Sequence, residues 1–168
     1  MKVSRSPFLL VMIVLLVLAT ARQAGAATAT ANLSVTASVI QACVVTGGTL
    51  AFGSYDPTAG ANVDQTGTFQ VACTKGSTGV TIGLGLGANA SGAQRRMTNG
   101  TDFLNYELYK EAARTNIWGN AGTALVSYAP VTTSGQTTFT AFGRVPSGQT
   151  NVGVGATYTD TVVITVTF

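Results

Sequence analysis

The two cysteines are the residues of this chain best suited to covalent chemistry. Cys43 and Cys73 are the only cysteines among 168 residues. An even number of cysteines in an exported chain favours a disulfide, and closing a loop of about 31 residues would stabilise the fold by roughly 3–4 kcal/mol in the chain-entropy model. A metal site would need more ligands, and the chain has no histidine. A redox pair would lie closer in sequence. We therefore predict a structural Cys43–Cys73 disulfide and no metal site.

Three carboxylates are the other candidates for chemistry. Glu107 and Glu111, with Asp102 nearby, could be imagined as the acid pair of a glycoside hydrolase. On a segment patterned as a strand followed by a turn, the simpler interpretation is a solvated face beside basic neighbours. The glycine-rich stretch Gly79–Gly92 lacks the Lys-Ser/Thr ending of a phosphate-binding loop. We predict that the chain is not an enzyme, with no catalytic residue and no cofactor.

The amino terminus has the pattern of a targeting segment. Lys2 and Arg5 form a basic leader, the run Phe8–Ala19 is apolar throughout, and Ala24-Gly25-Ala26 offers a small-x-small cleavage site. The apolar run is shorter than the roughly 20 residues of a membrane-spanning helix. We predict a signal peptide over residues 1–26 and export of the rest, with an uncleaved anchor as the alternative.

Removing the leader changes the charge balance. Nine basic residues minus three in the leader (Lys2, Arg5 and Arg22) leave six, which equals the six acidic residues. The mature chain is therefore formally neutral, and it has no basic stripe that could neutralise phosphates. This excludes nucleic acid as an expected partner. The remaining chain has the length of a single domain, so we predict one domain over residues 27–168.

Short segments of alternating apolar and polar residues follow one another through the mature chain. Such spacing, with glycine, asparagine, serine and proline between the segments, is typical of an all-β sandwich or barrel. A loop is expected over residues 88–100 and at most one helical turn over residues 110–114. The predicted strands or extended pieces are 33–43, 49–53, 66–73, 80–86, 103–109, 124–128, 137–144 and 158–168.

The two ends of the mature chain carry the clearest alternation. On the last segment, one face carries Val162, Ile164, Val166 and Phe168, and the other is mostly threonine. Near the start, Ala29, Ala31, Leu33 and Val35 alternate with polar residues. Two alternating segments at two free ends suggest a module that completes its sheet with another copy. A long first strand in a complete monomer would give the same pattern, so alternation alone leaves both interpretations open.

An ordered set of motifs resembles the spore coat protein U domain family, which includes subunits of archaic (Csu-type) chaperone–usher pili. The spacing around Gly155-Ala-Thr-Tyr158 is one residue longer than usual, which affects only the last loop. The matching pieces are Cys43, Phe52-Gly53-x-Tyr55-Asp56-Pro57, Cys73, Tyr106-Glu-Leu-Tyr109, Ala112-Ala-Arg-Thr115, Trp118-Gly119, Phe142-Gly-Arg-Val-Pro146, Gly148-Gln149, Tyr158-x-Asp160-Thr-Val162 and Val166-x-Phe168.

The resemblance implies an incomplete immunoglobulin-like β-sandwich that lacks its final strand and is completed by donor-strand exchange. A donor strand over about residues 27–36 would point Ala29, Ala31, Leu33 and Val35 into the groove of the next subunit. The rest of the segment, residues 36–43, would stay as the first strand. The acceptor groove would be lined partly by Val162, Ile164, Val166 and Phe168.

The same resemblance implies partners and location. These are other pilus subunits, a periplasmic chaperone and an outer-membrane usher, with export through the periplasm to a cell-surface pilus that supports adhesion and biofilm formation. No stable membrane insertion is expected of the mature chain. The alternatives are a small outer-membrane β-barrel, a pilus-tip adhesin, or a secreted coat protein that forms no pilus.

Overall fold

The structure is a computed structural model that describes residues 25–128, 135–155 and 157–168. Most of the predicted signal peptide, residues 1–24, lies outside the described residues. The chain divides into two units, residues 1–38 and 39–168. In the described part of the first unit, residues 25–38 have neither helix nor strand. Nowhere in the described residues is there a helix long and apolar enough to cross a membrane.

The described residues of the second unit form eight β-strands and one 3-10 turn, which confirms the all-β prediction. The turn is Gly122–Ala124. Five strands form one sheet in the order β1-β2-β7-β5-β4, and three form another in the order β6-β3-β8. The strands are β1 Cys43–Thr46, β2 Val63–Cys73, β3 Thr81–Leu84, β4 Arg95–Thr98, β5 Phe103–Tyr109, β6 Val126–Ser127, β7 Gln136–Val145 and β8 Ile164–Thr167.

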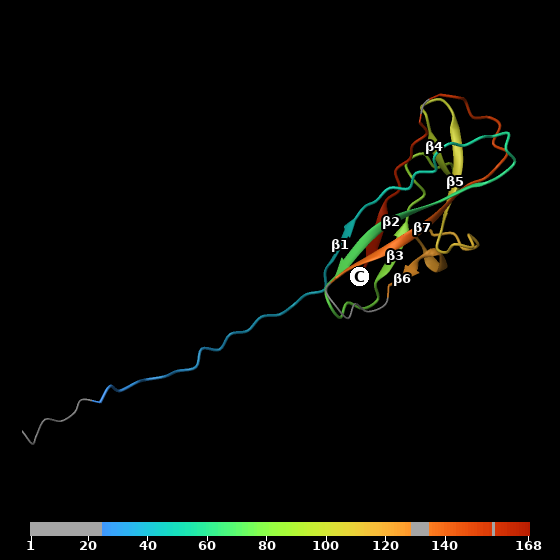
Figure 1. Ribbon diagram of the computed structural model, residues 1–168. Helices are drawn as coiled ribbons and strands as arrows, with labels where there is room; N and C mark the ends of the chain where they lie inside the picture. Colours follow the sequence, from blue (N-terminus) through green and yellow to red (C-terminus); the bar gives the residue numbers. More distant parts are fainter. Residues whose placement is uncertain (1–24, 129–134, 156) are drawn as a thin grey trace, which may run out of the picture. The chain divides into compact units, whose positions relative to one another are not determined.

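The long antiparallel pair β2–β7 is the largest element of the five-stranded sheet (Figure 1). Its register runs from Val63 opposite Val145 to Ala72 opposite Gln136. Alternate residues of β2 face inward, so Phe69 is buried whereas its neighbours in sequence are more exposed. The period of two in the sequence thus places one face of each strand in the core.

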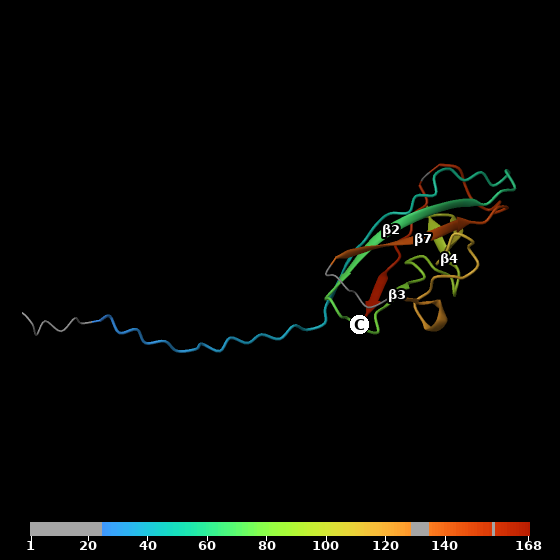
Figure 2. The ribbon, with the colours of Figure 1, turned by 60° about the horizontal axis from the view of Figure 1, so that its bottom comes forward.

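The three-stranded sheet forms the second layer, with β3 at its centre (Figure 2). Ile82 of β3 is completely buried, and its carbonyl accepts a hydrogen bond of 3.0 Å from the indole nitrogen of Trp118. Trp118 also packs against Phe69 of the opposite sheet, with 5.6 Å between ring centroids. Trp118 therefore belongs to the core between the layers, where its N–H is satisfied.

The Cys43–Cys73 disulfide joins the first residue of β1 to the last residue of β2, as predicted. The two cysteines are also opposite each other in the β1–β2 register. Beyond this point the Thr74 amide still donates to the Ala42 carbonyl at 2.8 Å. After Thr74 the chain turns, and the Ser77 amide donates a hydrogen bond back to the Thr74 carbonyl.

The predicted first strand, residues 33–43, is wrong. The first strand is β1, which begins at Cys43, and described residues 25–42 contain no strand. For the part of the segment in the second unit, the physical reason is that β2 stops at Cys73, so residues 39–41 have no continuing strand to pair with among the described residues. Alternation in the sequence marks a segment able to form a strand, but pairing requires a neighbour.

The predicted final strand, residues 158–168, is also shorter than expected. Regular pairing is confined to β8, because its partner β3 ends at Leu84. Before β8 the chain makes single contacts instead, with a bridge between Thr159 and Thr98 and a bond from the Gly85 amide to the Val163 carbonyl. Conversely, the predicted loop 88–100 contains β4, whose sequence Arg-Arg-Met-Thr shows no apolar alternation.

We expect the disulfide to stabilise the folded state mainly by restricting the conformations of the unfolded chain. Replacing both Cys43 and Cys73 with alanine should lower the free energy of unfolding by about 3–4 kcal/mol, measured by urea denaturation. Reducing the disulfide of the parent protein should give a loss of similar size. A loss below about 1 kcal/mol would contradict this role.

Candidate functional site: an open groove in the core

A groove of about 890 Å³ opens into the core of the unit formed by residues 39–168. Several of the residues that line it are buried residues of the hydrophobic core. They include Leu84 of β3, Leu104 and Leu108 of β5, and Ala141 of β7. Finished protein interiors contain few voids larger than a water molecule. A groove of this size, in the range of ligand sites, therefore marks a place where the fold can receive additional atoms.

One wall of the groove is the segment after β1, residues 48–57. Its side chains Leu50 and Phe52 reach the inner face of β2 and β7, where Gly67 and Gly143 leave room for them. A Cβ built on Gly143 would lie 2.8 Å from the Phe52 ring and 2.9 Å from Leu50, and one on Gly67 would lie 2.6 Å from Leu50. These two glycines therefore allow the wall to pack closely on the sheet.

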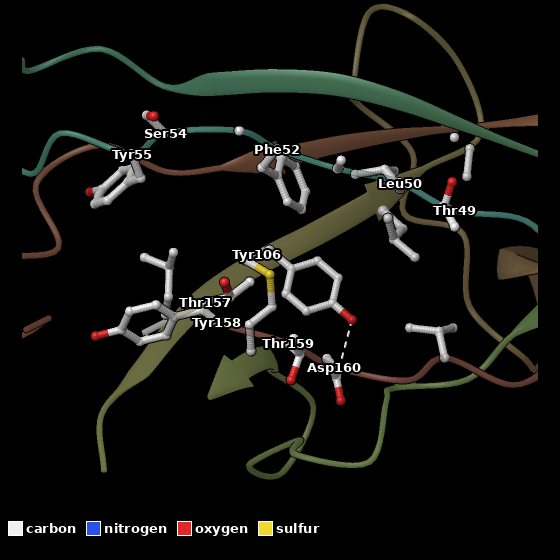
Figure 3. A pocket seen from close by; sticks show the side chains of 18 of the residues that line it. Thr49, Leu50, Phe52, Ser54, Tyr55, Tyr106, Thr157, Tyr158, Thr159 and Asp160 are labelled. Carbon is white, nitrogen blue, oxygen red and sulfur yellow. Dashed lines mark hydrogen bonds between the residues drawn. The ribbon is translucent and has the colours of Figure 1, made fainter. Parts of the chain in front are cut away.

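Tyr106 of β5 lies between the two walls (Figure 3). Its ring centroid is 5.9 Å from that of Phe52, and its hydroxyl donates a hydrogen bond of 2.7 Å to Asp160 Oδ2 on the opposite wall. Burial raises the pKa of Tyr106, and the hydrogen bond to Asp160 raises that pKa further. Tyr106 therefore stays a protonated donor at any physiological pH.

The opposite wall is the extended segment that leads into β8. Val162 and Ile164 line the groove from this side, and both pack against the core. Asp160 fixes the segment in place, because its Oδ1 accepts bonds from the Asn89 amide at 3.1 Å and from Asn89 Nδ2 at 3.0 Å. Polar side chains thus hold this wall where no regular strand pairing exists.

A small polar network closes the rim near Tyr55. The Tyr55 hydroxyl donates to the Pro146 carbonyl at 3.0 Å and accepts from the Gln149 amide at 2.9 Å. The Gln149 side chain in turn accepts from the Asn105 amide at 2.7 Å and donates to the Asn105 carbonyl at 2.9 Å. Gln149 therefore pairs with the edge of β5 as a backbone would, just after Pro146 has ended β7.

The structure brings only part of the predicted acceptor set to the groove. Val162 and Ile164 line it, whereas Val166 packs against the core outside the lining and Phe168 is 53% exposed. The role of these four residues as an acceptor surface stays a prediction.

The predicted donor residues lie in the described part of the first unit. All four are exposed in an extended segment: Ala29, Ala31, Leu33 at 87% and Val35 at 83%. Their insertion into a neighbour likewise stays a prediction.

The interpretation of Glu107 as part of a solvated face is wrong. Its carboxylate forms an ion pair with Arg95, whose side chain is fully buried, and it also accepts a bond from the Leu108 amide at 2.9 Å. Glu111 is different: one carboxylate oxygen organises the loop after β5 by accepting four bonds, two from Thr115 and two from Asn116. Both carboxylates thus have structural partners, and no group of His, Cys, Asp or Glu within the described ranges could hold a metal ion.

Sequence reasoning missed most of the groove. The sequence pattern places Leu50 and Phe52 in a short extended piece and Tyr106 in an alternating strand, and the family motifs include Phe52 and Tyr106, but none of this indicates a groove. The available signal was the pair Gly67 and Gly143, two glycines in otherwise bulky strands, which indicates close approach by another segment.

These features define a class of protein: an all-β subunit of two sheets with an open groove in its core. The family model for the Spore Coat Protein U domain matches residues 29–165, and the chain belongs to this family. It is 46% identical over 165 residues to Protein U of Myxococcus xanthus, covering 86% of this chain and 88% of that protein.

A solved structure shares the fold. It is the crystal structure of the CsuC–CsuE chaperone–tip adhesion subunit pre-assembly complex from archaic chaperone-usher Csu pili of Acinetobacter baumannii. The match has a TM-score of 0.53 at 23% identity and covers 77% of this chain. This chain spans only 40% of the matched chain. The resemblance to the spore coat protein U family is thus confirmed, together with the fold of a chaperone–usher pilus subunit.

The two glycines under the groove wall lead to a prediction. Gly143→Ala should displace Leu50 and Phe52 and lower the free energy of unfolding by about 1–3 kcal/mol, measured by urea denaturation. Gly47→Ala is the matched control, because a Cβ there has no atom within 4 Å, and it should leave stability unchanged. Equal stability of the two variants would show that the wall does not pack on β7 as described.

The Glu111 loop should depend on pH in a defined direction. Hydrogen bonds from Thr115, followed by those of Asn116, lower the pKa of Glu111 from 4.5 to about 2. Because the pKa of Glu111 is lower in the folded state than in the unfolded state, ionised Glu111 stabilises the fold. This contribution to the free energy of unfolding is complete above about pH 5 and is lost as the pH falls from 4.5 through 2.

Thermal melts across that range should therefore show that Glu111→Ala melts at a lower temperature than the parent protein. This difference should be constant above about pH 5 and shrink toward pH 2. Glu111→Gln is the control, because it keeps an acceptor oxygen that does not titrate in this range. A deficit in Glu111→Ala that did not change between pH 5 and pH 2 would contradict the assignment.

Proposed function

We propose that the chain is a non-enzymatic structural subunit of a secreted chaperone–usher pilus and polymerises by donor-strand exchange. The observation that carries this proposal is the groove, which opens the core beside β8, an edge strand. In the proposal, residues 27–36 of one copy enter the groove of the next. The mature subunit is residues 27–168, released from a signal peptide over residues 1–26.

The backbone of β8 supports this role. β8 is the last strand of its sheet and pairs with β3 alone among the described strands. The Val163 carbonyl already faces the β3 side, where it accepts a hydrogen bond of 2.9 Å from the amide of Gly85, the residue after β3. Because hydrogen-bonding direction alternates along a strand, the backbone groups of Val162, Ile164 and Val166 face the free edge. An added strand would pair there and satisfy them.

Side-chain sizes favour one direction for the added strand. Val162 and Ile164 line the groove, whereas Val166 does not. An antiparallel donor would place its large side chains, Leu33 and Val35, over the part lined by Val162 and Ile164. The small residues Ala29 and Ala31 would then lie beyond it, over Val166 and Phe168.

The energies are adequate for a stable joint. Burying Leu33 and Val35 contributes about 1.5–3 kcal/mol each, and each new backbone hydrogen bond adds a net 0.5–1.5 kcal/mol. Register follows from the same side chains, because a slip of one residue would turn Asn32 and Ser34 toward the core. The joint is therefore both strong and specific in register.

The proposed partners are further pilus subunits, a periplasmic chaperone that covers the groove before assembly, and an outer-membrane usher. Support comes from the family and from the shared fold with a pilus complex whose description names a chaperone and a tip adhesion subunit. The subunit would reach the cell surface through the periplasm, and the fibre would contribute to adhesion and biofilm formation.

A second candidate is a secreted coat that forms no pilus. The family description, Spore Coat Protein U domain, favours it. The same groove and donor segment would then link copies within a coat layer. Electron microscopy of material sheared from cells distinguishes fibres from a layer, whereas the joint between subunits is the same in both.

The donor segment provides the direct test. Leu33→Asp should abolish the boiling-resistant ladders of linked subunits seen on gels, because a charge would enter the apolar groove. Ser34→Asp adds the same charge one position along, on the opposite face, and should leave the ladders intact. Near-ultraviolet circular dichroism should be unchanged in both variants. Ladders of normal yield from Leu33→Asp would overturn donor-strand exchange.

A further inference from the structure

Arg95, the first residue of β4, is fully buried between the two sheets. Its relative exposure is 0%, and among the described residues Ser77 is the only other polar or charged residue classed as buried. A buried charge is costly unless it is paired and hydrogen-bonded. Arg95 meets both conditions, and its partners reveal what it holds together.

The guanidinium of Arg95 joins three separate segments. Nη2 donates to the carbonyls of Leu84 at 2.9 Å, Gly85 at 2.7 Å and Trp118 at 2.7 Å. Nε donates to the Gly85 carbonyl as well, at 2.9 Å. Nη1 forms the ion pair with Glu107 of β5. One planar group thus fixes the end of β3 to the neighbouring sheet.

This connection lies at the groove. Leu84 and Leu108 both line it, and the Leu108 amide donates to the carboxylate of Glu107 that pairs with Arg95. Leu84 comes from the three-stranded sheet and Leu108 from the five-stranded sheet. The ion pair therefore links, through their backbones, two groove-lining residues that come from the two different sheets.

A buried ion pair is a poor means of gaining stability, because apolar residues of similar volume stabilise a core equally well or better. Its benefit is fixed geometry. The apolar walls of a groove attract each other in water, since closing the groove would bury their surface. A polar link of fixed length between the two sheets resists that collapse and keeps their groove-lining residues at a defined spacing.

We propose that Arg95 and Glu107 are positioning residues that hold the groove open for an incoming β-strand. The inference rests on the proposed function, since it assigns this strand to residues 27–36 of another copy. The hydrogen bond from Tyr106 to Asp160 is a second link across the same groove and acts in the same direction. A groove preformed in this way lowers the cost of binding, because the walls need no rearrangement.

The test measures binding of a fluorescent peptide of residues 27–38 to the mature chain, at a dilution where the chain is monomeric. The double variant Arg95→Met with Glu107→Met removes the link and keeps apolar volume. We expect the association rate and the affinity to fall by about tenfold or more, because the walls must first separate. Tyr106→Phe loses one hydroxyl only and should lower both by a smaller factor.

Two controls separate positioning from general stability. Arg144→Met removes an ion pair with Asp64 on the outer face of the sheet and should leave peptide binding unchanged. The second control appends residues 27–38 after Phe168 through a short linker, so that each copy fills its own groove. In that completed form, the double variant should melt within a few degrees of the parent.

The outcomes are distinct. Unchanged peptide binding by both the double variant and Tyr106→Phe would overturn the inference and leave the proposed function standing. A loss of stability in the completed form that matches the loss of affinity would also overturn it, by showing a merely structural role. If the parent chain fails to bind the peptide, the proposed function itself is overturned, and the inference with it.

Discussion

A β-strand carries hydrogen-bonding groups along both of its edges, and within the described residues β8 pairs along one edge alone. Most proteins protect such an edge with charges, prolines or a covering segment. Here the edge is lined by Val162, Ile164 and Val166 and lies beside a groove that reaches the core. The free edge of β8 and the open groove lie in the same place, and the rest of the fold must be stable with both. One added strand would pair with the edge and cover the core.

An open core must be stabilised by other means, and the structure contains several. The disulfide connects β1 to β2, Gln149 pairs with the edge of β5 in place of a strand, and Asp160 anchors the segment before β8. Gln149 and Asp160 each use a side chain where a complete sandwich would use sheet pairing, whereas the disulfide reinforces a pairing that is already present. Polar side chains thus support the segments around the groove, although charged residues are scarce in the chain as a whole.

The sequence predicted the parts of this arrangement that depend on local pattern. Alternation located β2, β5 and β7, and the count of cysteines located the disulfide. It failed where pairing depends on distant partners. Residues 33–42 alternate well and form no strand, and β2, the partner of β1, ends at Cys73. Conversely, β4 has no alternation but pairs with β5, and its Arg95 is buried with bonds to distant carbonyls. The groove was only partly predicted, because its wall at Leu50 and Phe52 packs over glycines that are remote in sequence.

The position of the disulfide has a mechanical consequence. Any force applied along the chain ahead of Cys43 reaches Cys73 through a covalent bond, without first peeling β1 from its neighbour. Cys73 ends β2, and β2 is paired with β7 along ten successive positions, from Val63 to Ala72. Load entering at the cysteine pair is thus shared as shear by the longest ladder among the described strands. Tensile strength would accordingly be set by that ladder, and a reducing environment would weaken the chain under tension more than it weakens the chain at rest.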